Sequence, residues 1–134
     1  MKIILDSNVL ISGIFFAGPP YRILKAWQEG KIKLIISEEI LAEYQKVAEE
    51  LSQQFPSVDI DQILELLIIH AEIIDTQEFQ VTICEDPDDN KFISCALASK
   101  SKIIVSGDKH LLKISGYEGV LVLKPREFTD QFFK

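Results

Sequence analysis

The chain has 134 residues, of which 47% are hydrophobic and 26% are charged, and its formal net charge is −7. The length is typical of one domain and the composition of a folded chain, so we expect a single domain over residues 1–134. The negative charge argues against a generally basic nucleic-acid binder, and the apolar runs are too short to cross a bilayer. The first residues do not form a signal peptide, and two cysteines do not form a disulfide framework. We therefore expect a cytoplasmic protein without membrane association.

Short apolar runs alternate along the chain with longer segments of helical periodicity. Ser37 and Asp59 are suited to cap helices, and Pro125 is suited to the first position of a closing helix. In chain order we expect strand 2–5, helices 8–16 and 21–29, strand 32–36, helices 38–54 and 60–70, strands 72–75 and 79–83, helix 88–100, strand 103–106, helix 109–113, strand 120–123 and a helix from residue 125.

This alternation predicts an α/β fold with a parallel sheet covered by helices on both faces. Three expected strands, Ile3–Leu5, Leu34–Ile36 and Ile103–Val105, are continuous apolar runs, as burial on both faces requires.

The charge is distributed unevenly along the chain. Residues 35–90 carry one basic and fifteen acidic side chains, whereas both flanking segments are mildly basic. Solvated, Glu-rich helix faces explain most of these acids; alternatively, some of them bind cations while the basic ends attract polyanions.

Acids follow the apolar strands at the positions where open parallel sheets bind ligands, outside the carboxyl ends of the strands. Asp6 follows the first strand, Asp108 follows the strand that starts at Ile103, and the segment Asp86–Asn90 opens the helix between these positions. We therefore expect three separate segments to bring aspartates to one edge of the sheet.

Helix periodicity selects two further acids. Asp89 precedes an apolar stripe by three, four and seven positions and is expected to face inward, whereas Asp88 is the expected N-cap. Glu43 borders the apolar stripe of its own helix and is the acid of that helix expected to reach inward.

Four carboxylates at one site repel each other and stay ionised at neutral pH only when a cation joins them. Oxygen ligands of this kind select Mg²⁺ or Mn²⁺, ions that assist cleavage of phosphodiester bonds. A structural role remains open for each acid: Asp6 and Asp88 as helix caps, Asp108 as a turn residue and Glu43 as a solvated helix residue.

Four motifs occur in an order and spacing that resemble a PIN domain: Leu5–Ser12, Ser37–Tyr44, Asp86–Phe92 and Ser106–Leu112. The resemblance covers nearly the whole chain. It implies a three-layer α/β/α sandwich with a five-stranded parallel sheet and an endoribonuclease that cleaves single-stranded RNA with Mg²⁺ or Mn²⁺. The small single-domain members that it resembles are VapC-like toxins of bacterial toxin–antitoxin pairs, usually homodimeric and silenced by an antitoxin protein.

Matched by position, the resemblance assigns catalysis and metal binding to four acids and a supporting role to neighbouring polar residues. The acids are Asp6, Glu43, Asp89 and Asp108; the supporting residues are Ser7, Asn8 and Ser106. His110 stands where the family often has a further acid. This difference either weakens a second metal site or leaves that role to Asp86 or Asp88.

Several other residues have structural interpretations. Cys84, Cys95, Trp27 and Tyr44 are expected in the core, and His70 is expected to be structural. Five basic residues have two alternative interpretations, a cationic rim that binds an RNA backbone or ordinary exposed surface charge: Arg22, Lys25, Lys91, Lys109 and Lys113.

Two other functions remain open. A non-catalytic PIN-like module that binds a partner protein is one alternative, motivated by His110 and by the absence of a strongly basic composition. A phosphatase or phospho-accepting receiver domain also gathers aspartates at strand ends, but it needs a lysine after a later strand, and Lys109 is the nearest candidate.

Overall fold

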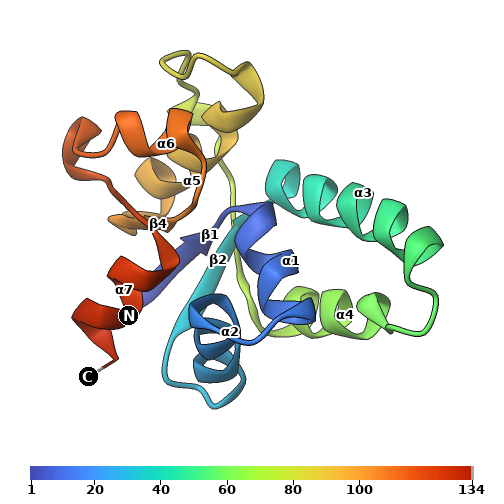
Figure 1. Cartoon of the computed structure of the whole chain (residues 1–134). Coiled ribbons are helices and arrows are strands. Elements are labelled where there is room, and N and C mark those ends of the chain that lie inside the picture. The colour runs from blue at the N-terminus through green and yellow to red at the C-terminus, as the bar shows by residue number, and fades with distance from the viewer. Residues whose placement is uncertain (134) are drawn as a thin grey trace.

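Five parallel strands form one sheet at the centre of the protein, as the computed structural model of the chain shows for residues 1–133 (Figure 1). Their order across the sheet is β3-β2-β1-β4-β5. The strands are β1 (Lys2–Leu5), β2 (Lys33–Ser37), β3 (Glu72–Ile74), β4 (Ile103–Val105) and β5 (Leu121–Leu123). The α/β fold with a five-stranded parallel sheet is thus confirmed.

Seven α-helices connect and cover the strands, and none among residues 1–133 is long and apolar enough to cross a membrane. Two predicted caps are present: the Ser37 hydroxyl accepts a hydrogen bond from the Ile40 N–H (3.2 Å), and the Asp59 carboxylate accepts one from the Gln62 N–H (3.1 Å). The helices are α1 (Ser7–Phe15), α2 (Pro19–Gln28), α3 (Glu38–Gln54), α4 (Ile60–His70), α5 (Asn90–Ser99), α6 (Lys109–Lys113) and α7 (Pro125–Phe132).

The segment between β3 and α5 differs from the sequence prediction. The strand expected over residues 79–83 is absent; a 3₁₀ turn at Gln77–Phe79 is followed by irregular chain. The segment has to leave an edge strand and reach α5, which packs across β1 to β4, so it has no neighbouring strand to pair with. A second 3₁₀ turn, Pro87–Asp89, precedes α5, and its cap is Asp86 rather than Asp88.

The order of the strands reverses at the centre of the sheet. From β1 the chain passes outward through β2 to β3, and then returns to the opposite side of β1 to form β4 and β5. Right-handed connections therefore place the helices of the first crossovers on one face and α5 on the other. In Figure 1, α1 to α4 lie on one side of β1 and β2, and α5 and α6 on the other.

The register between β1 and β4 positions the functional end of the sheet. Ile4 pairs with Ile104 and Leu5 with Val105, so Asp6 and Ser106 are the next residues on adjacent strands. The Asp6 N–H continues the ladder by donating to the Val105 carbonyl (3.0 Å). This is the point where the strand order reverses, at which open α/β sheets bind ligands.

Candidate functional site

Ser106 joins two of the predicted site acids. Its hydroxyl donates a hydrogen bond to Asp6 Oδ2 (2.6 Å) and accepts one from the backbone N–H of Asp108 (2.9 Å). Ser106 is completely buried and Asp6 is nearly so. The two chain segments that leave β1 and β4 are therefore fixed to each other by one buried hydroxyl, and the supporting role of Ser106 in the site stays a prediction.

Glu43 reaches inward from α3, as helix periodicity predicted. Its Oε2 accepts a hydrogen bond from the Ser7 hydroxyl, and its Oε1 lies 2.7 Å from Lys91 Nζ on α5. Ser7 contacts two of the predicted site acids, because its hydroxyl binds Glu43 and its backbone hydrogen-bonds the Asp6 carboxylate; its supporting role in the site stays a prediction. Asn8 is exposed to solvent, since it lies on the outer side of the first turn of α1.

Asp89 is buried in an electrostatically unfavourable position. Its Oδ2 is inaccessible to solvent and has no hydrogen-bond partner among residues 1–133. Burial, followed by repulsion from Asp108, Asp86, Asp6 and Glu43, raises the pKa of Asp89 to about 7. The inward orientation expected of Asp89 is confirmed.

Asp6 experiences opposing influences on its ionisation. Burial raises its pKa most strongly, and repulsion from Glu43 and Asp108 acts in the same direction. The hydrogen bonds from the Ser106 hydroxyl and the Ser7 backbone lower the pKa in part, and the net result is a raised pKa. Carboxylates at this end of the sheet thus interact electrostatically even though they come from distant parts of the chain.

Asp108 lies near the other acids and also caps the start of α6. It is half-buried, and its Oδ1 accepts a hydrogen bond from the His110 N–H (2.7 Å) at the start of α6. The His110 ring points to another acid, with Nδ1 2.7 Å from Glu85 Oε2 at the surface. Asp86 is exposed and holds the following turn by accepting a bond from the Asp88 N–H (3.0 Å), so it acts on the site through its charge.

The chemistry of these side chains suits a divalent cation. The predicted ligands are all carboxylates, the oxygen donors that Mg²⁺ and Mn²⁺ prefer, and Asp89 presents an unpaired buried oxygen. Within residues 1–133, however, no three acid, His or Cys side chains are arranged ready to hold an ion. Both Glu43 oxygens already have partners. The shared metal site of Asp6, Glu43, Asp89 and Asp108 stays a prediction.

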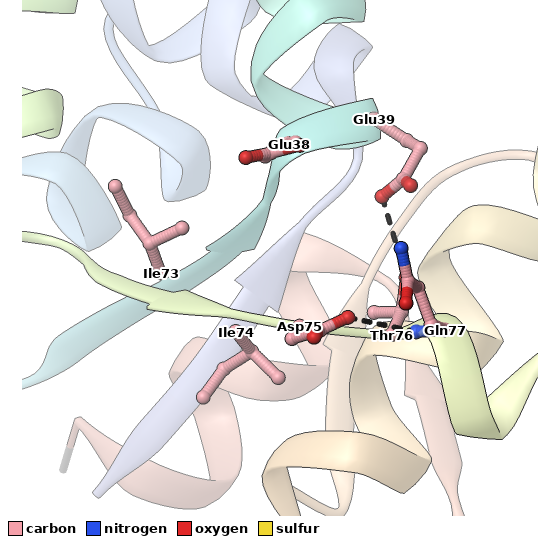
Figure 2. Close-up of a pocket in the computed structure, with 7 residues that line it drawn as sticks. All are labelled: Glu38, Glu39, Ile73, Ile74, Asp75, Thr76 and Gln77. Atoms are coloured by element: carbon pink, nitrogen blue, oxygen red, sulfur yellow. Dashed lines mark hydrogen bonds between the residues drawn. The ribbon is translucent and has the colours of Figure 1, made fainter.

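Two features of this region were not identified from the sequence. The first is the ion pair between Lys91 and Glu43, whose partners are 48 positions apart. The second is a cavity of about 300 Å³ beside the carboxyl end of β3 (Figure 2). Figure 2 shows the Glu39 carboxylate directed toward the overlapping side chains of Thr76 and Gln77. The Thr76 hydroxyl donates a hydrogen bond to Glu39 Oε2 (3.3 Å). The cavity is lined by Glu38, Glu39, Ile73, Ile74, Asp75, Thr76 and Gln77, and none of the four predicted site acids is among them.

The expected cationic rim is only partly at this end of the protein. Of its five members, Lys91 contacts a site acid, whereas the Arg22 guanidinium donates to the Phe133 carbonyl (3.2 Å) beyond α7. The core assignments are confirmed: Cys84, Cys95, Trp27 and Tyr44 are all buried. Burial raises the pKa of the two thiols to about 11 and 12, so they remain protonated and unreactive at neutral pH.

Comparisons with known proteins agree with this architecture. A model of the PIN domain family matches residues 2–110, a range that contains all four predicted site acids. The uncharacterized protein MJ1680 of Methanocaldococcus jannaschii is 31% identical over 147 aligned positions, which cover 100% of this chain and 93% of the relative. A chain in the crystal structure of VapBC2 from Rickettsia felis, bound to a DNA fragment from their promoter, has a similar fold, with a TM-score of 0.61 and 19% identity. That match covers 92% of this chain and 98% of the other.

Proposed function

Because the chain belongs to the PIN domain family, we propose that it is a metal-dependent endoribonuclease that cleaves phosphodiester bonds in single-stranded RNA. We assign catalysis and binding of Mg²⁺ or Mn²⁺ to Asp6, Glu43, Asp89 and Asp108. Asp86 and the polar residues Ser7, Asn8 and Ser106 are assigned supporting roles. The cation-binding acids also reconcile a nuclease with the net negative charge of the chain, because a bound cation would meet the phosphate.

The observation that carries the proposal is the burial of the Asp89 carboxylate among other acids, with one oxygen left without a hydrogen-bond partner. A carboxylate oxygen without a partner is costly to bury, and here it lies among further acids that raise its pKa to about 7. A divalent cation would remove both penalties, because it supplies the missing contact and neutralises the repulsion. A purely structural aspartate at a helix start has a backbone N–H as partner, as Asp59 does.

The residues of the chain have separable tasks in this reaction. Ser106 orients the Asp6 carboxylate, and Ser7 and Lys91 orient Glu43. The sheet and α5 hold these groups on rigid elements, which preserves their relative positions while the substrate binds. A bound Mg²⁺ or Mn²⁺ would supply activation of the attacking water and stabilisation of the charge on the phosphate.

We further propose that the protein is the toxin of a toxin–antitoxin pair and acts in the cytoplasm. The proposal is supported by the fold shared with a chain of VapBC2, in a match that covers 92% of this chain and 98% of the other. On this account an antitoxin protein silences the nuclease, and the nuclease forms a homodimer. Co-expression with the product of an adjacent gene, followed by size-exclusion chromatography with light scattering, tests both partners.

The nuclease is tested by incubating the purified protein with end-labelled, mixed-sequence single-stranded RNA in Mn²⁺, Mg²⁺ or chelator. The matched variants are Asp89→Asn and Asp88→Asn, which remove a buried and an exposed carboxylate one position apart. We expect metal-dependent cleavage by the wild type and Asp88→Asn, and none by Asp89→Asn. Cleavage that survives in Asp89→Asn, or intact RNA with folded, partner-free wild type, would contradict the proposal.

One observation favours the alternative of a non-catalytic module that binds a partner protein. The Lys91 ammonium forms an ion pair with Glu43, so part of the negative charge of the site acids is neutralised by a side chain of the protein itself. This alternative predicts that Asp6→Asn leaves the cellular effect of expressing the protein unchanged while a partner protein co-purifies. The nuclease predicts that the same substitution abolishes any growth inhibition.

A further inference from the structure

Lys91 is the one basic side chain that forms an ion pair with a predicted site acid among the described residues. Its Nζ lies 2.7 Å from Glu43 Oε1, and the two side chains are only 19% and 24% exposed. The other ion pairs within residues 1–133 are all at least 42% exposed on both sides. Reduced access to water strengthens the attraction between the charges, so this pair is electrostatically distinct from a surface ion pair.

Glu43 has partners on both oxygens in this arrangement. Oε2 receives the Ser7 hydroxyl and Oε1 receives the Lys91 ammonium. A second cation could approach Glu43 only by replacing one of these donors or by accepting repulsion from the ammonium a few ångströms away. The hydroxyl carries no net charge, so the ammonium is the main competitor of an incoming cation.

The position of Lys91 on α5 explains why it neutralises one acid and not the others. It lies two residues after Asp89, near the start of the helix, and reaches across to α3. Asp89 Oδ2 meanwhile keeps no partner among residues 1–133. The ammonium thus satisfies Glu43 and leaves a buried, unpaired oxygen on the same helix terminus, where a further cation is still needed.

We propose that Lys91 is a built-in counterion that holds Glu43 when no divalent cation is bound and competes with that cation for the Glu43 carboxylate. The inference rests on the proposed metal site and adds a residue that sets its affinity. Lys91 is a positioning residue in this account, because it acts through Glu43. The ion pair accordingly stabilises the site when no metal is bound, and it lowers the affinity of the site for the metal.

The test measures binding of Mn²⁺ alone to the full chain, by isothermal titration calorimetry at constant pH. Lys91→Met removes the ammonium and keeps the length of the side chain. Lys2→Met is the matched control, since it removes the same charge and breaks an ion pair of 2.8 Å, with Glu72 at the far end of the sheet. We expect Lys91→Met to bind Mn²⁺ about tenfold more tightly than the wild type, a difference of about 1.4 kcal/mol, and Lys2→Met to bind within about twofold.

A second pair of variants separates competition for Glu43 from a general effect of charge. In a Glu43→Gln background, Lys91 has no carboxylate to hold, so adding Lys91→Met should change Mn²⁺ affinity by less than about threefold. Lys91→Gln provides a second uncharged variant, and circular dichroism confirms that each protein is folded.

The possible results separate a failure of the role proposed for Lys91 from a failure of the proposed metal-dependent nuclease. Unchanged or weaker Mn²⁺ binding by Lys91→Met, or a full tenfold effect that persists with Glu43→Gln, would overturn the role of Lys91 and leave the metal site standing. Failure of every variant to bind Mn²⁺ would overturn this role together with the metal dependence of the proposed function.

Discussion

The stability of metal-free Asp89→Asn relative to the wild type is expected to rise as the pH increases from 4 to 8. The pKa of Asp89 is about 7 in the folded state against an ordinary value of 3.8. The folded state therefore keeps a proton between pH 4 and pH 7 that the unfolded chain has released. Stability falls with rising pH wherever the folded state binds more protons, so the wild type loses stability across this window.

The magnitude follows from the pKa shift. A rise of the pKa from 3.8 to about 7 corresponds to at most about 4 kcal/mol at 1.36 kcal/mol per pH unit, and solvent screening of this group lowers the figure. Asparagine does not titrate, so the free energy of unfolding of Asp89→Asn relative to the wild type should rise by up to about 4 kcal/mol between pH 4 and pH 8. Any cost of burying the amide is the same at every pH and does not affect this difference.

Urea unfolding in chelator at pH 4.5, 6 and 8, followed by circular dichroism, measures this difference directly. Asp88→Asn is the control, because it removes an exposed carboxylate from the adjacent position and should follow the wild type at every pH. A difference between Asp89→Asn and the wild type that stays constant from pH 4.5 to pH 8 would refute the electrostatic reasoning.

Three other predictions concern the same region and the core. Binding of Mn²⁺ at pH 7 should release about half a proton from Asp89, seen as a dependence of the calorimetric enthalpy on the buffer; an enthalpy independent of the buffer contradicts it. Ser106→Ala should lower the free energy of unfolding by about 2–3 kcal/mol, because it removes the buried hydrogen bond to Asp6. A loss below about 0.5 kcal/mol in urea unfolding, which is the size expected of a surface substitution, would argue against this role. Gly13→Ala should cost about 1–3 kcal/mol in the same assay, because its Cβ would lie 2.8 Å from the Pro20 carbonyl oxygen, a backbone atom of α2 that moves only if the two helices separate. An unchanged midpoint would show that the contact relaxes freely.

The central sheet was predictable because the sequence of each central strand is itself characteristic. β1, β2 and β4 contain continuous apolar runs, which are typical of parallel strands that are buried on both faces of a sheet. The polar residues directly after β1 and β4 then had to meet at one edge, and Asp6 and Ser106 do so. The caps at Ser37 and Asp59 were predictable for a similar reason, because they depend on backbone groups only three residues away.

Features that depend on tertiary context could not be predicted in the same way. Residues 79–83 have strand-like composition but no strand beside them, since the chain there passes from the sheet edge to α5. The turn before α5 contains three aspartates close together, and which of them caps it is decided by backbone geometry rather than by residue type. The contact of Lys91 with Glu43 depends on how α3 and α5 pack, and neither helix alone indicates it.

The most direct test of the central claim, that the acids around Asp89 bind a divalent cation, is a crystal structure of the protein soaked in Mn²⁺ with diffraction data at the manganese absorption edge. We predict an anomalous peak between the carboxylates of Asp6, Glu43, Asp89 and Asp108, within about 2.5 Å of Asp89 Oδ2. A fully occupied peak elsewhere, such as in the acidic cavity of Glu38, Glu39 and Asp75, with none beside Asp89, would contradict it.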